Sequence, residues 1–296
     1  MGYLWLAVAL AGGIAKGLCG KKISGQMGSF RDCLFINTVR MLLCAVIALL
    51  TVLAASEGDL LQVSPRSIEI CGVCAVGMSV FCVCWMYAYR TEAYIFLNIF
   101  TMLGTVVTCL LDLWIYGTTM GPYQWLGIGA ILGAVVIVSR YNRETKGKLR
   151  PKGIAILILG CLGSAVADFT QKIYMTELGG SAAVYNFYSY ALAAVLLAAG
   201  LGICAGLGRS AVTPSLRSAG SLLLCGAISA GLFVNSTAKT LAAGLLPAAQ
   251  IYPVLQGANL IASILLGQFL FGERITVKSV LGMLCAFVGL LLVRGG

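Results

Sequence analysis

The chain has 296 residues, of which 60% are hydrophobic and only 10% charged, and its mean hydropathy is +0.97. This composition excludes a soluble globular protein and is typical of a polytopic membrane protein. The net charge is +10, but the positive residues lie between apolar segments and form no basic domain. We therefore interpret them as topology signals and expect no nucleic-acid partner.

Ten apolar segments are predicted to cross the membrane as α-helices, which makes the fold class an all-α membrane protein. About 20 residues are enough to span a hydrocarbon core of about 30 Å. In chain order the segments are 3–20, 33–55, 68–89, 94–117, 121–139, 153–175, 181–207, 217–238, 246–271 and 277–293.

A basic stretch, 140–152, separates a first half, 1–139, from a second half, 153–296. Most Lys and Arg residues between the apolar segments fall on the side of this linker, which predicts that the linker is cytoplasmic and both termini are extracytoplasmic. The opposite side is assigned only Arg66, Lys172, Lys239 and Arg294. The expected location is a bacterial cytoplasmic (inner) membrane.

The two halves repeat each other. Three residues of the first segment recur 150 residues later, since Gly13, Lys22 and Ile23 match Gly163, Lys172 and Ile173. Asn37 similarly corresponds to Asn186. Because five helices per half is an odd number, the halves must enter the membrane from opposite sides. Inverted repeats of this kind place a substrate site near the midplane where the halves meet.

These features together resemble the ten-helix, EamA-type branch of the drug/metabolite transporter superfamily. The resemblance rests on Gly13 to Lys22, on Asn37-Thr-Val-Arg40, and on the segment from Leu246 through Pro253 to Gly272-Glu-Arg274. The equivalent turn of the first half, at Gly117, lacks the Glu-Arg pair. The resemblance implies a secondary transporter that exports an amino acid or related metabolite by alternating access. The alternative is a facilitator or importer of an organic cation or amine.

Polar residues recur on one face of two segments. The first set, in 94–117, is Asn98, Thr101, Thr105, Thr108 and Asp112. The second set, in 246–271, is Tyr252, Gln256, Asn259 and Ser263. Spacings of three and four residues put each set on one helix face. We favour the lining of a hydrated cavity over hydrogen bonds between helices, because the pattern occurs in both halves.

Charged residues inside apolar segments are costly and therefore informative. Asp168 either serves a substrate site, as a proton carrier or a partner of a cationic substrate, or forms a structural ion pair with Lys16 or Arg40. Arg40 either binds a carboxylate or phosphate or, as we slightly favour, extends to the cytoplasmic interface. Asp112 lies closer to a helix end, where solvated surface is the favoured interpretation.

Aromatic residues cluster in two segments, at Trp85, Tyr87 and Tyr89 and at Tyr185, Tyr188 and Tyr190. Such residues at helix ends usually form the interfacial belt, which is the favoured interpretation. Alternatively, Trp85 and Tyr89 form one wall of a cage for an amine through cation–π contacts. Asn235 and Lys239 repeat the four-residue spacing.

Motifs that the sequence lacks, and others that it contains, further restrict the functions expected of the protein. The chain has no His, no G-x-S-x-G and no P-loop, so we expect neither an enzyme nor ATP drive. No metal or other cofactor is expected, and proton coupling is left open. The pairs Gly129/Gly133 and Gly202/Gly206 predict close helix approach, within the chain or in a homodimer. The expected partners are a small-molecule substrate and the lipid bilayer.

Overall fold

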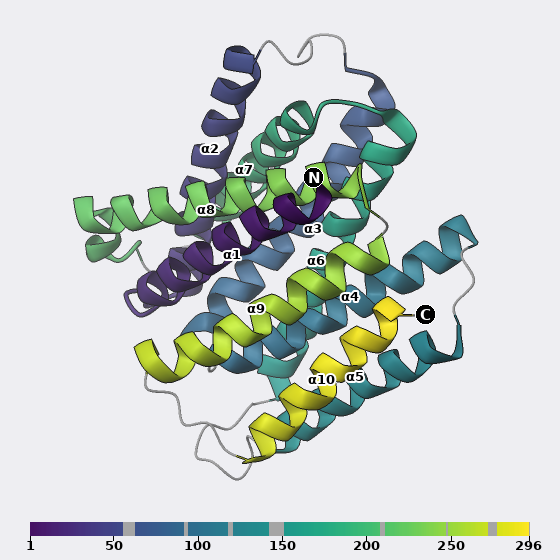
Figure 1. Ribbon diagram of the computed structural model, residues 1–296. Coiled ribbons are helices and arrows are strands. Elements are labelled where there is room, and N and C mark those ends of the chain that lie inside the picture. The colour runs from purple at the N-terminus through teal and green to yellow at the C-terminus, as the bar shows by residue number, and fades with distance from the viewer. Residues whose placement is uncertain are drawn as a thin grey trace.

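The computed structural model describes residues 1–55, 63–91, 94–117, 121–141, 151–207, 211–246, 248–271 and 277–295. For some residues inside these ranges, including Tyr89 and Asn98, only the backbone is described. This part of the chain forms ten α-helices (Figure 1). The prediction of an all-α protein is confirmed.

The helices follow the predicted segments closely. They are α1 (Gly2–Ser24), α2 (Phe30–Ala55), α3 (Pro65–Thr91), α4 (Tyr94–Tyr116), α5 (Pro122–Tyr141), α6 (Pro151–Ile173), α7 (Ala182–Gly206), α8 (Ala219–Ala243), α9 (Ala248–Phe271) and α10 (Val277–Gly295). A π-helical turn, η1 (Tyr174–Leu178), extends α6, and a 3₁₀ turn, η2 (Pro214–Arg217), precedes α8.

Six of these helices are long and apolar enough to cross a membrane within the described residues: Gly2–Ser24, Phe30–Ala54, Pro65–Ala88, Gly153–Leu178, Ala182–Gly206 and Ala219–Ala243. Shorter apolar stretches occupy Leu103–Tyr116 and Val280–Leu292. Large aliphatic side chains such as Leu53, Leu223 and Leu281 are exposed on the outside of the bundle, which suits contact with lipid. The chain is thus a multi-pass membrane protein.

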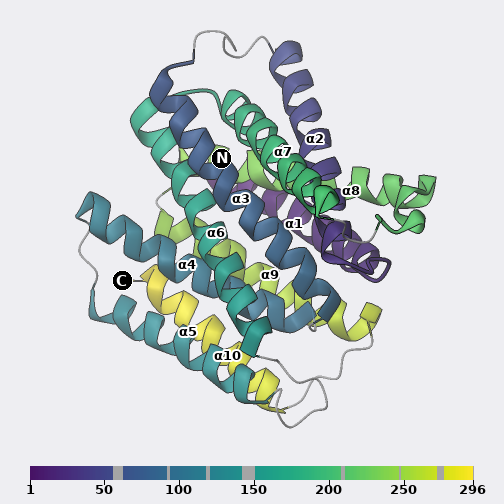
Figure 2. The ribbon, with the colours of Figure 1, turned by 180° about the vertical axis from the view of Figure 1, so that it is seen from behind.

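The helices pack in pairs that link the two halves. α1 packs along α8 and α3 along α6, while α2 packs against α7, α4 against α9 and α5 against α10 (Figures 1 and 2). Each helix of the first half has a counterpart five helices later in the chain. When every helix is exchanged for its counterpart, the α1–α8 pair becomes the α6–α3 pair and the other three pairs stay the same. This exchange is what two similarly packed halves related by a two-fold axis would give, and the inverted orientation of the halves stays a prediction.

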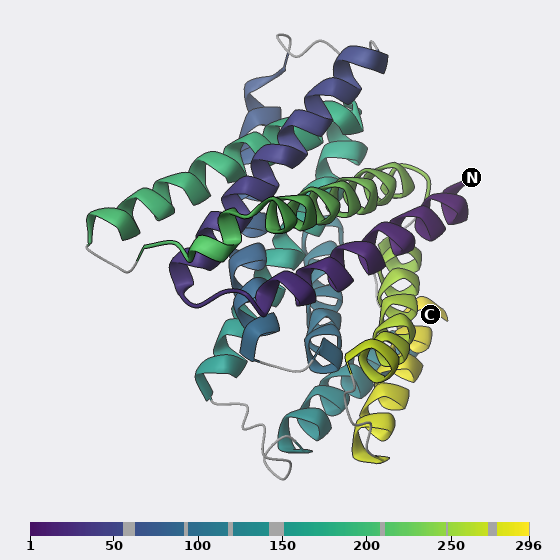
Figure 3. The ribbon, with the colours of Figure 1, turned by 90° about the vertical axis from the view of Figure 1, so that its left-hand side faces the viewer.

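Two glycine contacts bring the long helix pairs close together. A Cβ on Gly12 of α1 would lie 2.7 Å from the carbonyl oxygen of Gly231 on α8. A Cβ on Gly163 of α6 would lie 2.6 Å from the carbonyl oxygen of Gly77 on α3. Figure 3 shows α1 and α8 side by side along most of their length. Only glycine permits backbones to approach this closely.

The glycine pairs singled out in the sequence do not act in this way. Nothing lies within 4 Å of a Cβ placed on Gly129, Gly133, Gly202 or Gly206. The prediction that these residues bring helices together is therefore wrong within the described chain, because their spacing recurs by chance in a glycine-rich sequence. A homodimer through the same residues stays a prediction.

Lys239 was placed beyond the eighth predicted segment but is helical, since it lies within α8, which continues to Ala243. Lys172, which lies inside the sixth predicted segment, is in the last turn of α6. The predicted end of the eighth segment at 238 was too early, because a lysine was assumed to mark the membrane surface. Residues 142–150 of the basic linker and the Gly-Glu-Arg turn at 272–274 lie outside the described residues.

The close helix crossing predicts that Gly163→Ala destabilises the protein, since the new methyl group would overlap the backbone of α3. Overpacking of this kind costs about 1–3 kcal/mol. The control is Gly133→Ala, whose Cβ would meet open space and whose higher helix propensity should keep or raise stability. Unfolding in detergent micelles measures both, and equal losses would contradict the assignment of the crossing.

Candidate functional site

A central cavity lies where α1, α3, α4, α6, α8 and α9 meet, near the middle of these helices. Its volume is about 100 Å³, several times the space that one water molecule requires. Six of the residues singled out in the sequence line it: Trp85, Thr101, Asp168, Asn235, Gln256 and Asn259. The cavity therefore takes polar side chains from both halves of the chain.

The other four candidates lie elsewhere or are not described. Tyr252 is buried behind Asp168, and its hydroxyl donates a hydrogen bond to the carbonyl oxygen of Asp168 at 2.8 Å. Arg40 lines a smaller adjoining cavity. The side chains of Asn98 and Tyr89 lie outside the described residues, as does that of Ser263.

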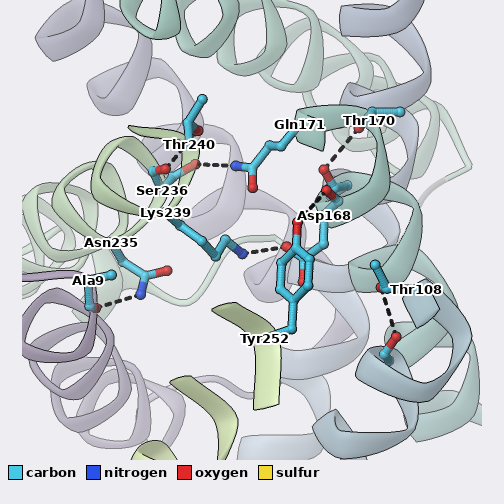
Figure 4. A network of polar contacts seen from close by, with 12 residues as sticks. Ala9, Thr108, Asp168, Thr170, Gln171, Asn235, Ser236, Lys239, Thr240 and Tyr252 are labelled. Carbon is cyan, nitrogen blue, oxygen red and sulfur yellow. Dashed lines mark hydrogen bonds and ion pairs between the residues drawn. The ribbon is translucent and has the colours of Figure 1, made fainter. Parts of the chain in front are cut away.

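Asp168 forms an ion pair with Lys239, which reaches it from α8 (Figure 4). The structural alternative had named Lys16 or Arg40 as the partner, and that assignment is wrong. The two side chains are 9% and 15% exposed, so each charge requires the other. Together with the Tyr252 hydrogen bond, the pair connects α6, α8 and α9 at one wall of the cavity.

A second polar chain connects α6, α8 and α7. Gln171 donates to the hydroxyl of Ser236 at 3.0 Å, and Ser236 donates to the amide oxygen of Asn186 at 3.3 Å. The amide nitrogen of Asn186 donates to Thr237 at 3.0 Å. The buried Oε1 of Gln171 has no hydrogen-bond partner within the described residues. Gln171 also lines the cavity, so this acceptor without a partner lies close to the space that a ligand would occupy.

The sequence candidates omitted several cavity residues: Lys16, Gln171, Ser236 and Lys239. Helical spacing carries the signal for two of them. Gln171 follows Asp168 by three residues, and Lys239 follows Asn235 by four, so each shares a face with a candidate. No comparable signal identifies Ser236, because serine is common in such helices.

Arg40 points into the protein, and the interfacial interpretation is wrong. It is only 5% exposed. Its Nη1 donates to the amide oxygen of Asn37 at 2.6 Å, and Asn37 in turn donates to the carbonyl oxygens of Cys33 and Cys82 at 2.8 and 3.2 Å. Asn37 thus fixes the guanidinium against α3.

The aromatic residues also lie deeper than expected. Tyr185 and Tyr190 are fully buried and Trp85 nearly so, which contradicts an interfacial belt for these three. Trp85 stacks on Phe81, with ring centroids 5.2 Å apart. The Lys16 ammonium lies 5.9 Å from the Phe81 centroid. A cation–π contact exists here, but the cation belongs to the protein.

The residues on the polar face of α4 have different roles. Thr101 lines the cavity, whereas Thr105 is buried and Thr108 donates to the carbonyl oxygen of Gly104 in its own helix at 2.9 Å. Asp112 forms an ion pair with Lys172 of α6, and its side chain is largely buried. The expectation of a solvated Asp112 is therefore wrong.

The cysteines and carboxylates show no arrangement that would suit a metal. Within the described residues, no group of three or more Cys, Asp or Glu side chains is placed to hold an ion. The twelve cysteines are unpaired thiols, and most are buried among apolar side chains.

Comparison with known proteins finds a family that matches the first half of the chain. Residues 1–140 match the model of the EamA-like transporter family. No curated protein matches the sequence. Among 28 matching chains of solved structures, one described only as "Crystal structure of protein" has a TM-score of 0.65 at 14% identity, over 97% of this chain and 96% of that chain. At this identity the likeness extends to the fold alone.

The buried ion pair predicts that Asp168→Asn is strongly destabilising, because it leaves the Lys239 ammonium without a counter-charge. Breaking such a pair costs about 3–5 kcal/mol. Adding Lys239→Met should recover part of the loss, since no buried charge then remains.

Arg66→Gln is the matched control, because it removes an exposed ion pair with Glu177 that is worth about 0–1 kcal/mol. Unfolding midpoints in detergent measure all four proteins. Equal effects of Asp168→Asn and Arg66→Gln would contradict the structural importance of the buried pair.

Proposed function

We propose that the chain is a secondary transporter of a small polar metabolite. The proposal rests on the match of residues 1–140 to the EamA-like transporter family, which is part of the drug/metabolite transporter superfamily. The substrate is an amino acid or related compound, and the direction is export across a bacterial cytoplasmic membrane. Family membership indicates a membrane transporter, as opposed to an enzyme. The substrate, the direction and the mechanism are the proposal.

The observation that carries the proposal is the polar cavity in the middle of an apolar bundle. Gln256 and Asn259 from the second half meet Thr101 from the first around a space of about 100 Å³. Amide groups are expensive in a membrane unless they meet protein partners or water. Their gathering around one internal space supports a substrate site near the midplane.

Polar contacts at the two ends of the bundle support alternating access. At one end, Glu177 accepts hydrogen bonds from Arg66 at 3.2 Å and from Tyr116 at 2.8 Å, joining α3, α4 and η1. At the other end, Asp32 accepts two hydrogen bonds from Thr213 at 2.9 and 2.7 Å, joining α2 to the segment before α8. Such contacts can break in turn, so that the cavity opens to one side at a time.

Asp168 provides the coupling step of this proposal. Loss of the negative charge that holds Lys239 would weaken the contact between α6 and α8. A proton gradient would then bias which end opens. No cofactor is required for this step.

Transport of an organic cation is the weaker alternative. A cationic substrate would have to displace Lys239 from Asp168. It would also meet Lys16 at the aromatic wall formed by Phe81 and Trp85. Like charges inside the protein, where the effective dielectric constant is lower than in water, repel more strongly than in solution.

The proposal predicts that Gln256→Leu and Asn259→Leu lower uptake of labelled amino acids into proteoliposomes at least tenfold. Each change removes polar groups from the cavity and leaves the helix packing intact. The control is Ile261→Val, on the outer surface of the same helix, which should transport normally. Wild-type uptake of no amino acid, with or without a pH gradient, would overturn the proposed substrate. Unchanged uptake in both leucine variants would overturn the proposed site.

A further inference from the structure

Two positive charges, those of Lys16 and Arg40, adjoin the central cavity without an ion-pair partner in the part of the chain that the structure describes. Lys16 lines the central cavity, and both Lys16 and Arg40 line the smaller cavity beside it. The two cavities share Lys16, Phe81, Cys82 and Trp85, so they are contiguous. Within the described residues, the three ion pairs of the chain involve Arg66, Lys172 and Lys239.

The guanidinium of Arg40 is held with one nitrogen unused. Nη1 is committed to Asn37, but the buried Nε has no hydrogen-bond partner within the described residues. Arg40 as a whole is nearly inaccessible outside the cavity. An unpaired N–H on a buried charged group is strongly unfavourable. The fixed orientation leaves this donor able to bind an acceptor that enters the small cavity.

Lys16 is placed at the junction of the two cavities. Its ammonium lies 5.9 Å from the centroid of the Phe81 ring, a contact that compensates a buried ammonium weakly. A Cβ on Gly231 would lie 3.0 Å from the backbone nitrogen of Lys16, so the close α1–α8 crossing holds this part of α1 in position. The backbone from which the Lys16 side chain extends is therefore fixed beside the cavity.

We infer that Lys16 and Arg40 form the binding subsite for an acidic group of the substrate, which is a small metabolite with a carboxylate or phosphate. The inference rests on the proposed transport function and specifies its substrate class. Guanidinium groups bind such oxygens in a planar, paired geometry, and an ammonium adds a point charge from another direction. The rest of the substrate would occupy the central cavity, where Gln256 and Asn259 provide polar contacts.

The charge balance of the site favours an acidic group over a basic one. Among the residues that the structure describes, the two cavities are lined by Lys16, Arg40 and Lys239 and by one carboxylate, that of Asp168. Since Lys239 already neutralises Asp168, two positive charges remain. An entering carboxylate or phosphate would compensate them, whereas a purely cationic substrate would increase the repulsion.

The test is thermal unfolding in detergent with four probes that share a four-carbon chain: succinate, 4-aminobutyrate, putrescine and 1,4-butanediol. Saturable stabilisation is expected from the two carboxylates and not from the diamine or the diol, because bound ligand stabilises the folded state in proportion to its affinity. Arg40→Gln and Lys16→Gln should each weaken carboxylate binding about tenfold or more. Arg40→Lys should retain part of the affinity, since it keeps the charge.

Arg217→Gln is the matched control, since it removes a positive charge from an exposed side chain of η2 that lines neither cavity. It should bind the carboxylates as the wild type does. Stabilisation by putrescine or butanediol that equals that of succinate would overturn the inference, as would carboxylate binding that survives both glutamine substitutions. Absence of carboxylate binding in the wild type would also overturn it. If amino acid uptake still depends on Gln256 in any of these cases, the transport proposal stands and only the acidic subsite fails.

Discussion

Four charged side chains inside an apolar bundle are the constraint on which the rest of the structure depends. Lys16, Arg40, Asp168 and Lys239 come from four different helices. A single charge at the centre of a bilayer costs about 2.5–3.5 kcal/mol or more. The helices therefore turn these side chains toward one another, where an ion pair, amide groups and an internal cavity receive them. Their positions explain why the polar space lies at the centre.

Glycine determines how closely the charged helices approach. The contact of Gly12 with Gly231 joins α1 to α8, and the contact of Gly77 with Gly163 joins α3 to α6. The two contacts lie in helix pairs that are counterparts of each other, since α6 and α3 correspond to α1 and α8. Lys16 lies one turn beyond Gly12, so the crossing also fixes the ammonium beside the cavity. Close packing and charge placement are thus parts of one arrangement.

The fold was predictable from sequence because hydropathy and helix length govern a membrane chain directly. The site was only partly predictable. Helical spacing placed Gln256 and Asn259 on one face, and that face does line the cavity. Spacing along one helix does not show which residues of other helices form ion pairs with it. The sequence therefore placed Lys239 in a loop and did not identify it as the partner of Asp168. Arg40 lies about two turns into the second predicted segment, within reach of the membrane surface for a long side chain, and only tertiary packing shows that it points inward.

The central claim is that the cavity is reached from each side of the membrane in turn. It is tested most directly by placing cysteine at Gln256 in a Cys82→Ala background, since Cys82 also lines the cavity. A membrane-impermeant thiol reagent is then applied from outside or inside proteoliposomes. Alternating access predicts modification from both faces, slowed by a bound substrate. Modification from neither face, or from one face at a rate that no metabolite changes, would contradict the account.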